Sequence, residues 1–137
     1  MKKNFIVDQG VYIKIKNNCY DLHNNYDFIS CKFEPFKSII YLTWLKLDTK
    51  WGNLSDPSKI VIVFHNILSF SMSNAFMTEK VTTIQEIGYK DPDDKDLDWL
   101  NGEEYFNPNS QIIFRFENDE FIRVGAGVVE GKVGDDW

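Results

Sequence analysis

The sequence lacks most of the features that mark the common functional classes. It contains two cysteines and two histidines in 137 residues. Cys19 and Cys31 lie in no C-x-x-C or other paired spacing, so we expect neither a disulfide framework nor a metal site. Basic residues are also few, with 15 Lys and Arg against 21 Asp and Glu, a net charge of −6. This balance excludes the basic type of nucleic-acid-binding protein.

Long hydrophobic runs are absent too. The longest strongly apolar run, from Ile60 to Phe64, is far shorter than the roughly 20 residues of a membrane helix. The chain starts with two lysines, but Asp8 interrupts the apolar stretch that a secretory signal would need. We therefore expect a soluble cytoplasmic protein that makes no membrane contact. Secretion by a route that needs no signal peptide is the alternative.

Alanine, the best helix former, is scarce, because Ala75 and Ala126 are the only two. Ile, Val, Phe, Tyr, Trp and Thr are plentiful, and these residues favour the half-buried surface of a sheet. The length fits one domain. We expect a single mostly β domain over residues 1–137, an antiparallel β-sandwich or strongly curved sheet of about seven to nine strands with little helix.

Apolar runs separated by turn residues give the positions of these strands. The predicted strands cover residues 5–7, 11–16, 28–34, 39–47, 59–65, 81–89, 111–117 and 121–129. Residues 66–70 could continue the fifth strand through a bulge, residues 71–77 are expected to be loop, and residues 96–100 could form one helical turn. Asn118 and Asp119 predict a tight hairpin turn, since both tolerate positive φ.

Alternation along these strands predicts the core. One face of each strand should be buried, and Trp44 should join the core from a central strand. The other expected core residues are Ile13, Ile15, Ile29, Phe33, Tyr41, Leu45, Ile62, Phe64, Ile84, Ile112, Phe114, Ile122 and Val124.

One stretch of the chain accounts for the whole net charge. We name residues 91–106 the acidic segment; it holds seven acidic residues against Lys95 alone, and 7 − 1 equals the excess of six carboxylates in the chain. Aromatic residues lie among these carboxylates. Surface carboxylates speed the encounter with a basic partner, and a buried aromatic anchor slows dissociation. The residues expected to bind a partner are Asp91, Asp93, Asp94, Asp96, Asp98, Trp99, Glu103, Glu104 and Tyr105.

Other interpretations of the same residues are open. The acidic segment could be only a solvated surface loop. The segment is not an EF-hand, because Trp99 and Tyr105 stand where an EF-hand loop needs Gly and Glu. Weak calcium binding by its clustered carboxylates is a further alternative. A small enzyme could use His23 or His65, and a carbohydrate-binding sandwich could use Trp51 and Trp99.

A zinc site or a Cys–His nucleophile pair would need the two cysteines and the two histidines. Zinc takes thiolate and imidazole ligands, but Cys19, His23, Cys31 and His65 match no paired ligand spacing. No local motif supports either cysteine as a nucleophile. We expect no metal, no cofactor and no catalytic residue.

Three short elements resemble small acidic bacterial immunity proteins of toxin–immunity systems. These elements are Leu22-His23-Asn24, Phe64-His65-Asn66-Ile67 and the late alternating strand from Ile112 to Phe116. They cover about a third of the chain, Asn24 stands where Asp is more usual, and the same features suit β-domains of other kinds. The resemblance implies a non-enzymatic inhibitor that binds a toxin domain, and it carries over no active-site residue. The sequence therefore predicts a binding protein for a basic protein partner.

Overall fold

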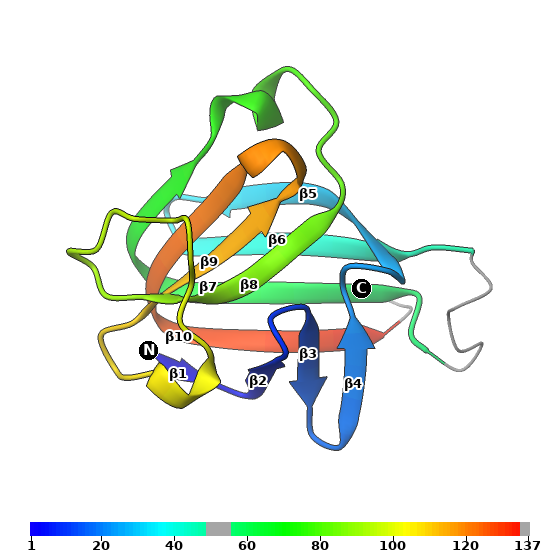
Figure 1. The fold of residues 1–137 in the computed structure, drawn as a ribbon, viewed down its shortest axis with the longest axis horizontal. Helices are drawn as coiled ribbons and strands as arrows, with labels where there is room; N and C mark the ends of the chain where they lie inside the picture. The colour runs from blue at the N-terminus through cyan, green and yellow to red at the C-terminus, as the bar shows by residue number, and fades with distance from the viewer. Residues whose placement is uncertain (49–55, 135–137) are drawn as a thin grey trace.

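Two largely antiparallel sheets make up the part of the chain that the computed structural model describes, residues 1–48 and 56–134 (Figure 1). The larger sheet has the strand order β5-β6-β7-β10-β9-β8, and β1 pairs in parallel with β10. The smaller sheet has the order β2-β3-β4. The strands are β1 (Lys2–Lys3), β2 (Phe5–Asp8), β3 (Tyr12–Ile15), β4 (Asn18–Asp21), β5 (Tyr26–Glu34), β6 (Ile39–Lys46), β7 (Lys59–Met72), β8 (Ile84–Lys90), β9 (Gln111–Phe116) and β10 (Phe121–Gly134).

Helical structure in the described residues is limited to three short 3-10 turns. They are η1 (Asn74–Met77), η2 (Glu103–Tyr105) and η3 (Glu117–Asp119). None of them approaches the length and apolar character that a helix needs to cross a bilayer. The expected all-β class is confirmed.

The larger sheet curls into a half-barrel around its two longest strands. β7 and β10 have 14 residues each and pair along their whole length. Their register shifts between Gly125 and Ala126, which leaves Leu68 of β7 as an extra residue. Such a bulge increases the local twist of a sheet and helps it to curve. The predicted continuation of the fifth strand through a bulge is therefore confirmed.

The smaller sheet covers the concave side of the half-barrel. In Figure 1, β3 and β4 run nearly at right angles to β7 and β10. Buried side chains of the small sheet, among them Phe5, Ile13 and Ile15, belong to the same core cluster as those of the large sheet. Gly131 of β10 permits this contact, because a Cβ there would lie 2.9 Å from Cδ1 of Ile15.

Most of the predicted core is buried. The buried residues are Ile13, Ile15, Trp44, Ile62, Phe64, Ile84, Ile112, Phe114, Ile122 and Val124. Asn118 and Asp119 have φ of 61° and 60°, as the predicted hairpin turn requires.

Four predicted core positions are wrong. Ile29 is 47% exposed because it is the extra residue of a bulge between Phe28 and Ser30. On β6 the alternation is opposite to the predicted one, so Leu45 is 41% exposed and Tyr41 is only half-buried, while the even-numbered side chains point inward. Phe33 is 52% exposed because β5 is an edge strand.

Three boundary predictions also need correction. Residues 96–100 form no helical turn; the nearest such turn is η2, at Glu103–Tyr105. The strand predicted at residues 81–89 is β8, which starts at Ile84, and residues 71–72, expected to be loop, belong to β7. The alternation rule missed β4, which is short and mostly exposed, and β1, which has two residues.

Candidate functional site

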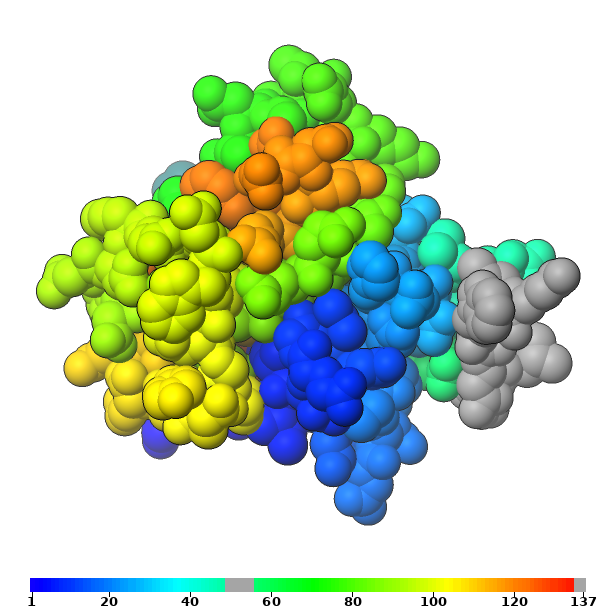
Figure 2. Space-filling model, viewed as in Figure 1, coloured from blue at the N-terminus to red at the C-terminus, as the bar shows by residue number. Residues whose placement is uncertain are grey.

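The acidic segment folds back over the outer face of the large sheet. It leaves β8 after Lys90 and returns at Asn101, which pairs with Tyr89 through two backbone hydrogen bonds of 2.9 and 3.0 Å. Leu100 packs on Gly88, since a Cβ on that glycine would lie 2.5 Å from the Cβ of Leu100. Figure 2 shows the segment, in yellow-green and yellow, at the surface beside the small sheet in blue. The segment is therefore packed against the sheet and also covers the edge of β8.

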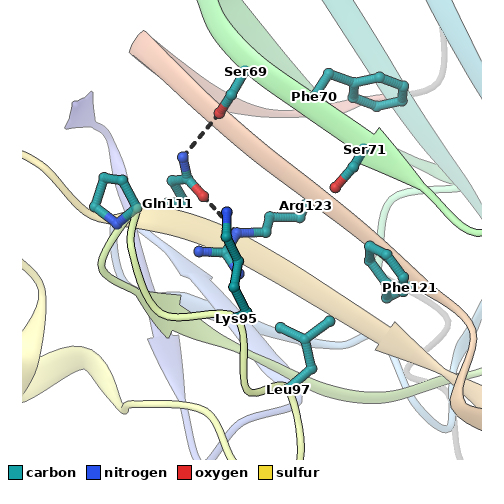
Figure 3. A pocket seen from close by; sticks show the side chains of 9 residues that line it. Ser69, Phe70, Ser71, Lys95, Leu97, Gln111, Phe121 and Arg123 are labelled. Carbon is teal, nitrogen blue, oxygen red and sulfur yellow. Dashed lines mark hydrogen bonds between the residues drawn. The ribbon is translucent and has the colours of Figure 1, made fainter.

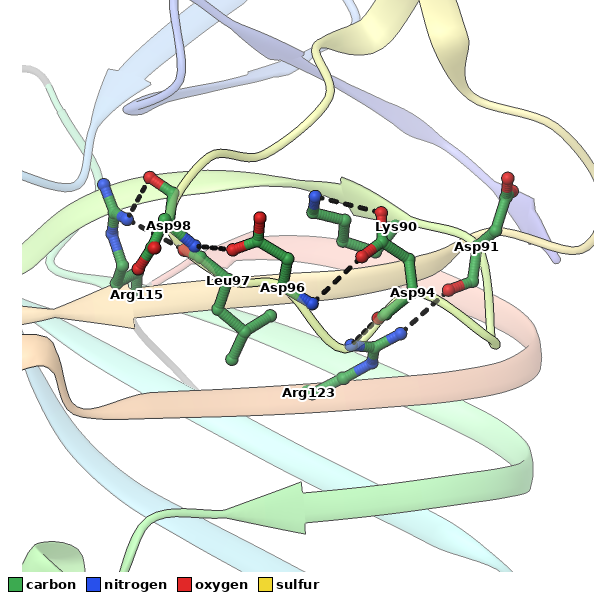
Figure 4. A network of polar contacts seen from close by, with 8 residues as sticks. All are labelled: Lys90, Asp91, Asp94, Asp96, Leu97, Asp98, Arg115 and Arg123. Carbon is green, nitrogen blue, oxygen red and sulfur yellow. Dashed lines mark hydrogen bonds and ion pairs between the residues drawn. The ribbon is translucent and has the colours of Figure 1, made fainter.

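The two arginines of the chain hold this segment by its backbone (Figure 4). Arg115 of β9 donates to the carbonyls of Leu97 and Asp98, at 2.9 and 3.1 Å. Arg123 of β10 donates to the carbonyls of Asp94 and Asp91, at 2.7 and 2.9 Å. Both arginines bind carbonyl oxygens of the segment, and neither forms an ion pair with a carboxylate of the segment.

Lys90 lies under the segment and contacts both a carboxylate and an aromatic ring. Its side chain is fully buried, with Nζ 3.2 Å from Oδ2 of Asp94 and 3.9 Å from the ring centroid of Trp99. The backbone N–H of Asp96 and the ammonium of Lys90 lower the pKa of Asp94. Asp94 therefore stays ionised and neutralises a buried cation, and Trp99 covers that cation with one face of its ring.

Glu103 joins the acidic segment to the N-terminal strands. Its Oε2 accepts hydrogen bonds from the backbone N–H of Val7, at 3.0 Å, and from the hydroxyl of Tyr89, at 2.7 Å. Its Oε1 forms an ion pair with Lys3, whose side chain is 6% exposed. Burial and the hydrogen bond to Glu103 raise the pKa of Tyr89. Glu103 thus has internal partners for both oxygens.

The remaining predicted residues face solvent. Asp93, Asp98 and Glu104 are exposed, and their carboxylates make no hydrogen bond or ion pair with the residues that the structure describes. Trp99 is 58% exposed and Tyr105 is 65% exposed.

Two further aspartates are exposed and bind neighbouring groups with one oxygen. Asp91 accepts a 3.3 Å bond from the Asn107 amide, and Asp96 accepts a 2.8 Å bond from the backbone N–H of Asp98. The segment therefore presents ordered carboxylates with two large aromatic side chains among them.

The histidines have separate environments. Nδ1 of His23 is hydrogen-bonded to the carbonyl of Ile84. Nε2 of His65 lies 2.7 Å from Oε1 of Glu130, on neighbouring strands of the outer face. No hydroxyl or thiol in the described ranges is hydrogen-bonded to either member of this His65–Glu130 pair. The pair has the base and the orienting group of a catalytic site without a nucleophile beside it.

The cysteines and the tryptophan platforms give little further chemistry. Cys19 is exposed on β4, and burial raises the pKa of Cys31 to about 11. Among the described residues, no three His, Cys, Asp or Glu side chains are placed to hold a metal ion. Trp51, one of the two candidate sugar platforms, lies outside the described residues.

Sequence reasoning missed the cations that shape this site, Lys3, Lys90, Arg115 and Arg123. A signal was present, because the only two arginines of the chain stand at alternate positions within predicted apolar strands. A long cationic side chain in such a strand needs acceptors on the outer face. Comparison of the chain with models of known protein families, with curated proteins and with solved structures found no match.

Proposed function

We propose that the chain is a non-enzymatic binding protein that docks a protein with a basic surface on the acidic segment. The observation that carries this proposal is that the arginines under the segment bind its backbone and leave three of its carboxylates at the surface, unpaired with any described residue. Arg115 and Arg123 bind backbone carbonyls of the segment, and Asp93, Asp98 and Glu104 are exposed without an ion-pair partner among the described residues. Repulsion among fixed carboxylates costs stability, and a basic partner would relieve it.

The exposed aromatic residues suit the same role. Tyr105 is 65% exposed and Trp99 is 58% exposed, and both lie among the carboxylates of the acidic segment. Phe33, Phe36 and Phe70 are exposed too, but they belong to other parts of the chain. Large aromatic side chains are enriched among the residues that dominate binding energy at interfaces, whereas rim charges act mainly on the association rate. The resemblance to immunity proteins suggests that the partner is a toxin domain.

The test compares two triple variants in affinity capture from the native host, followed by binding kinetics with the purified captured protein. Asp93→Asn/Asp98→Asn/Glu104→Gln neutralises the free carboxylates of the segment. The control, Asp8→Asn/Asp48→Asn/Glu79→Gln, removes three exposed carboxylates elsewhere. We expect the first variant to associate about tenfold more slowly at low salt and to lose most of its salt dependence, because steering depends on these charges.

The control variant should bind like the wild type. Tyr105→Ala should act on the dissociation rate, and it is a cleaner test than Trp99→Ala, which would also uncover Lys90. Equal association rates for both triple variants and the wild type at low salt would refute the proposal.

The His65–Glu130 pair supports a second candidate, a small hydrolytic or acid–base enzyme. A His–carboxylate hydrogen bond of 2.7 Å is the arrangement that orients an imidazole as general base. The discriminating variant is His65→Gln. It should leave partner binding unchanged if the acidic segment is the docking surface, whereas loss of a measured turnover in this variant would favour the enzyme.

A further inference from the structure

A cavity of about 330 Å³ lies between the acidic segment and the strands β7, β9 and β10 (Figure 3). Its wall from the segment includes Lys95 and Leu97, and its floor is formed by Arg123 and Gln111. The second half of β7 closes the other side. No carboxylate of the acidic segment lines this cavity.

The charge of the cavity is opposite to that of its surroundings. Two cations, Lys95 and Arg123, line it together with serine, glutamine and apolar side chains, and no carboxylate does. The side chain of Lys95 makes no hydrogen bond or ion pair with any residue in the described ranges. Arg123 is 8% exposed, and its hydrogen bonds go to Gln111 and to two backbone carbonyls, all neutral acceptors.

The guanidinium of Arg123 has donors to spare. A guanidinium has five N–H groups, and three are used by these three bonds, one each from Nε, Nη1 and Nη2. The described residues place no carboxylate within ion-pair distance of it. The charge of Asp94 attracts Arg123 only from beyond ion-pair distance. An anion in direct contact with this buried guanidinium would therefore lower the cost of burying it.

The rest of the lining sets the size and type of the anion. The hydroxyl of Ser71 adds a donor, and Phe121 and Leu97 supply apolar walls, whereas the ring of Phe70 points to the other face of the sheet (Figure 3). The volume is at the small end of ligand sites. The nearby aspartates of the acidic segment oppose a doubly charged ligand, whereas a single carboxylate matches the fork of an arginine.

We propose that this cavity binds a small monoanionic ligand, a carboxylate that carries a short aromatic or aliphatic tail. The carboxylate contacts Arg123, Lys95 and Ser71, and the tail lies against Phe121 and Leu97. This site is independent of the proposed docking function, since none of the three free carboxylates of the acidic segment lines it.

The test is a titration of the full chain with benzoate, followed by two-dimensional amide NMR and calorimetry. Benzamide, which has the same shape without charge, is the ligand control, and inorganic phosphate tests for a general anion site. We expect saturable benzoate shifts at residues of β10 and of the acidic segment near Lys95, and at least tenfold weaker binding of benzamide.

The protein variants avoid Arg123, because its loss could also release the acidic segment. Lys95→Gln should weaken benzoate binding about five- to tenfold and Ser71→Ala about two- to fivefold, and the exposed control Lys80→Gln should leave it unchanged. Equal binding of benzamide and benzoate, an unchanged affinity in Lys95→Gln, or tighter binding of phosphate than of benzoate would each overturn the proposal.

Discussion

Glu103 and Glu104 are neighbours of identical chemistry, and the structure gives them opposite roles. Replacing either by Gln changes the net charge by the same single unit. The two carboxylate oxygens of Glu103 accept from three donors, the ammonium of Lys3, the Val7 amide and the Tyr89 hydroxyl. In Glu103→Gln, the side-chain amide would have only one acceptor oxygen for these three donors. Removing one partner of a buried ion pair costs about 3–5 kcal/mol, and the 25% exposure of Glu103 places the expected loss near the lower end, about 3 kcal/mol.

That loss should be easy to measure by urea or thermal denaturation. Unfolding entropy of about 2.1 cal/mol/K per residue gives about 0.29 kcal/mol/K for this chain, so Glu103→Gln should lower Tm by about 10 °C. Glu104→Gln should change the free energy of unfolding by less than about 0.5 kcal/mol, as an exposed substitution does. Equal effects of the two variants would refute the assignment of Glu103 as a structural residue.

Three substitutions and one labelling experiment test the fold. Phe114→Ala removes a buried ring 5.6 Å from that of Trp44 and should cost about 3–5 kcal/mol in chemical denaturation. Gly88→Ala would place a Cβ 2.5 Å from that of Leu100, so it should cost about 1–3 kcal/mol and raise hydrogen exchange in the acidic segment. The raised pKa of Tyr89 stabilises the fold below pH 10 and this stabilisation is lost as the pH rises above 10, so Tyr89→Phe should flatten the alkaline side of the stability curve. With a pKa of about 11, Cys31 should react with iodoacetamide at pH 8 on the order of a hundredfold more slowly than free cysteine, as followed by peptide mass spectrometry.

The strands could be predicted because their hydrophobic periods are local. β9 has Ile112, Phe114 and Phe116 on one face and Arg115 on the other, and all four lie as the alternation predicts. The hairpin turn after β9 follows from local backbone preferences in the same way.

Which face of a strand is buried was predictable only where the two faces differ. β6 carries apolar side chains on both faces, so nothing local decides whether Tyr41 or Leu42 points inward. The bulge at Ile29 changes the alternation of β5 and depends on its pairing with β6. Pairing partners are set by tertiary structure, and a one-residue shift moves a side chain to the other face.

The net charge of the candidate site could be predicted from the sequence, but not which of its carboxylates are paired inside the protein and which are free at the surface. The sum over residues 91–106 identifies an acidic surface without the structure. It does not distinguish Glu103, which binds three groups from distant parts of the chain, from Glu104, which is exposed. The roles of Arg115 and Arg123 likewise depend on how the segment folds back over the sheet.

The docking proposal and the cavity proposal both require that the acidic segment has a fixed structure on the sheet. Amide hydrogen exchange at Asp96, Asp98 and Asn101 measures this directly. These three N–H groups donate to Oδ1 of Asp94, Oδ1 of Asp96 and the carbonyl of Tyr89. We predict exchange at least about a hundredfold slower than in an unstructured peptide, and faster exchange at all three in Arg115→Gln. Exchange near the peptide rate in the wild-type protein would contradict the account, because a segment without fixed structure can neither present ordered carboxylates nor form a wall over Arg123.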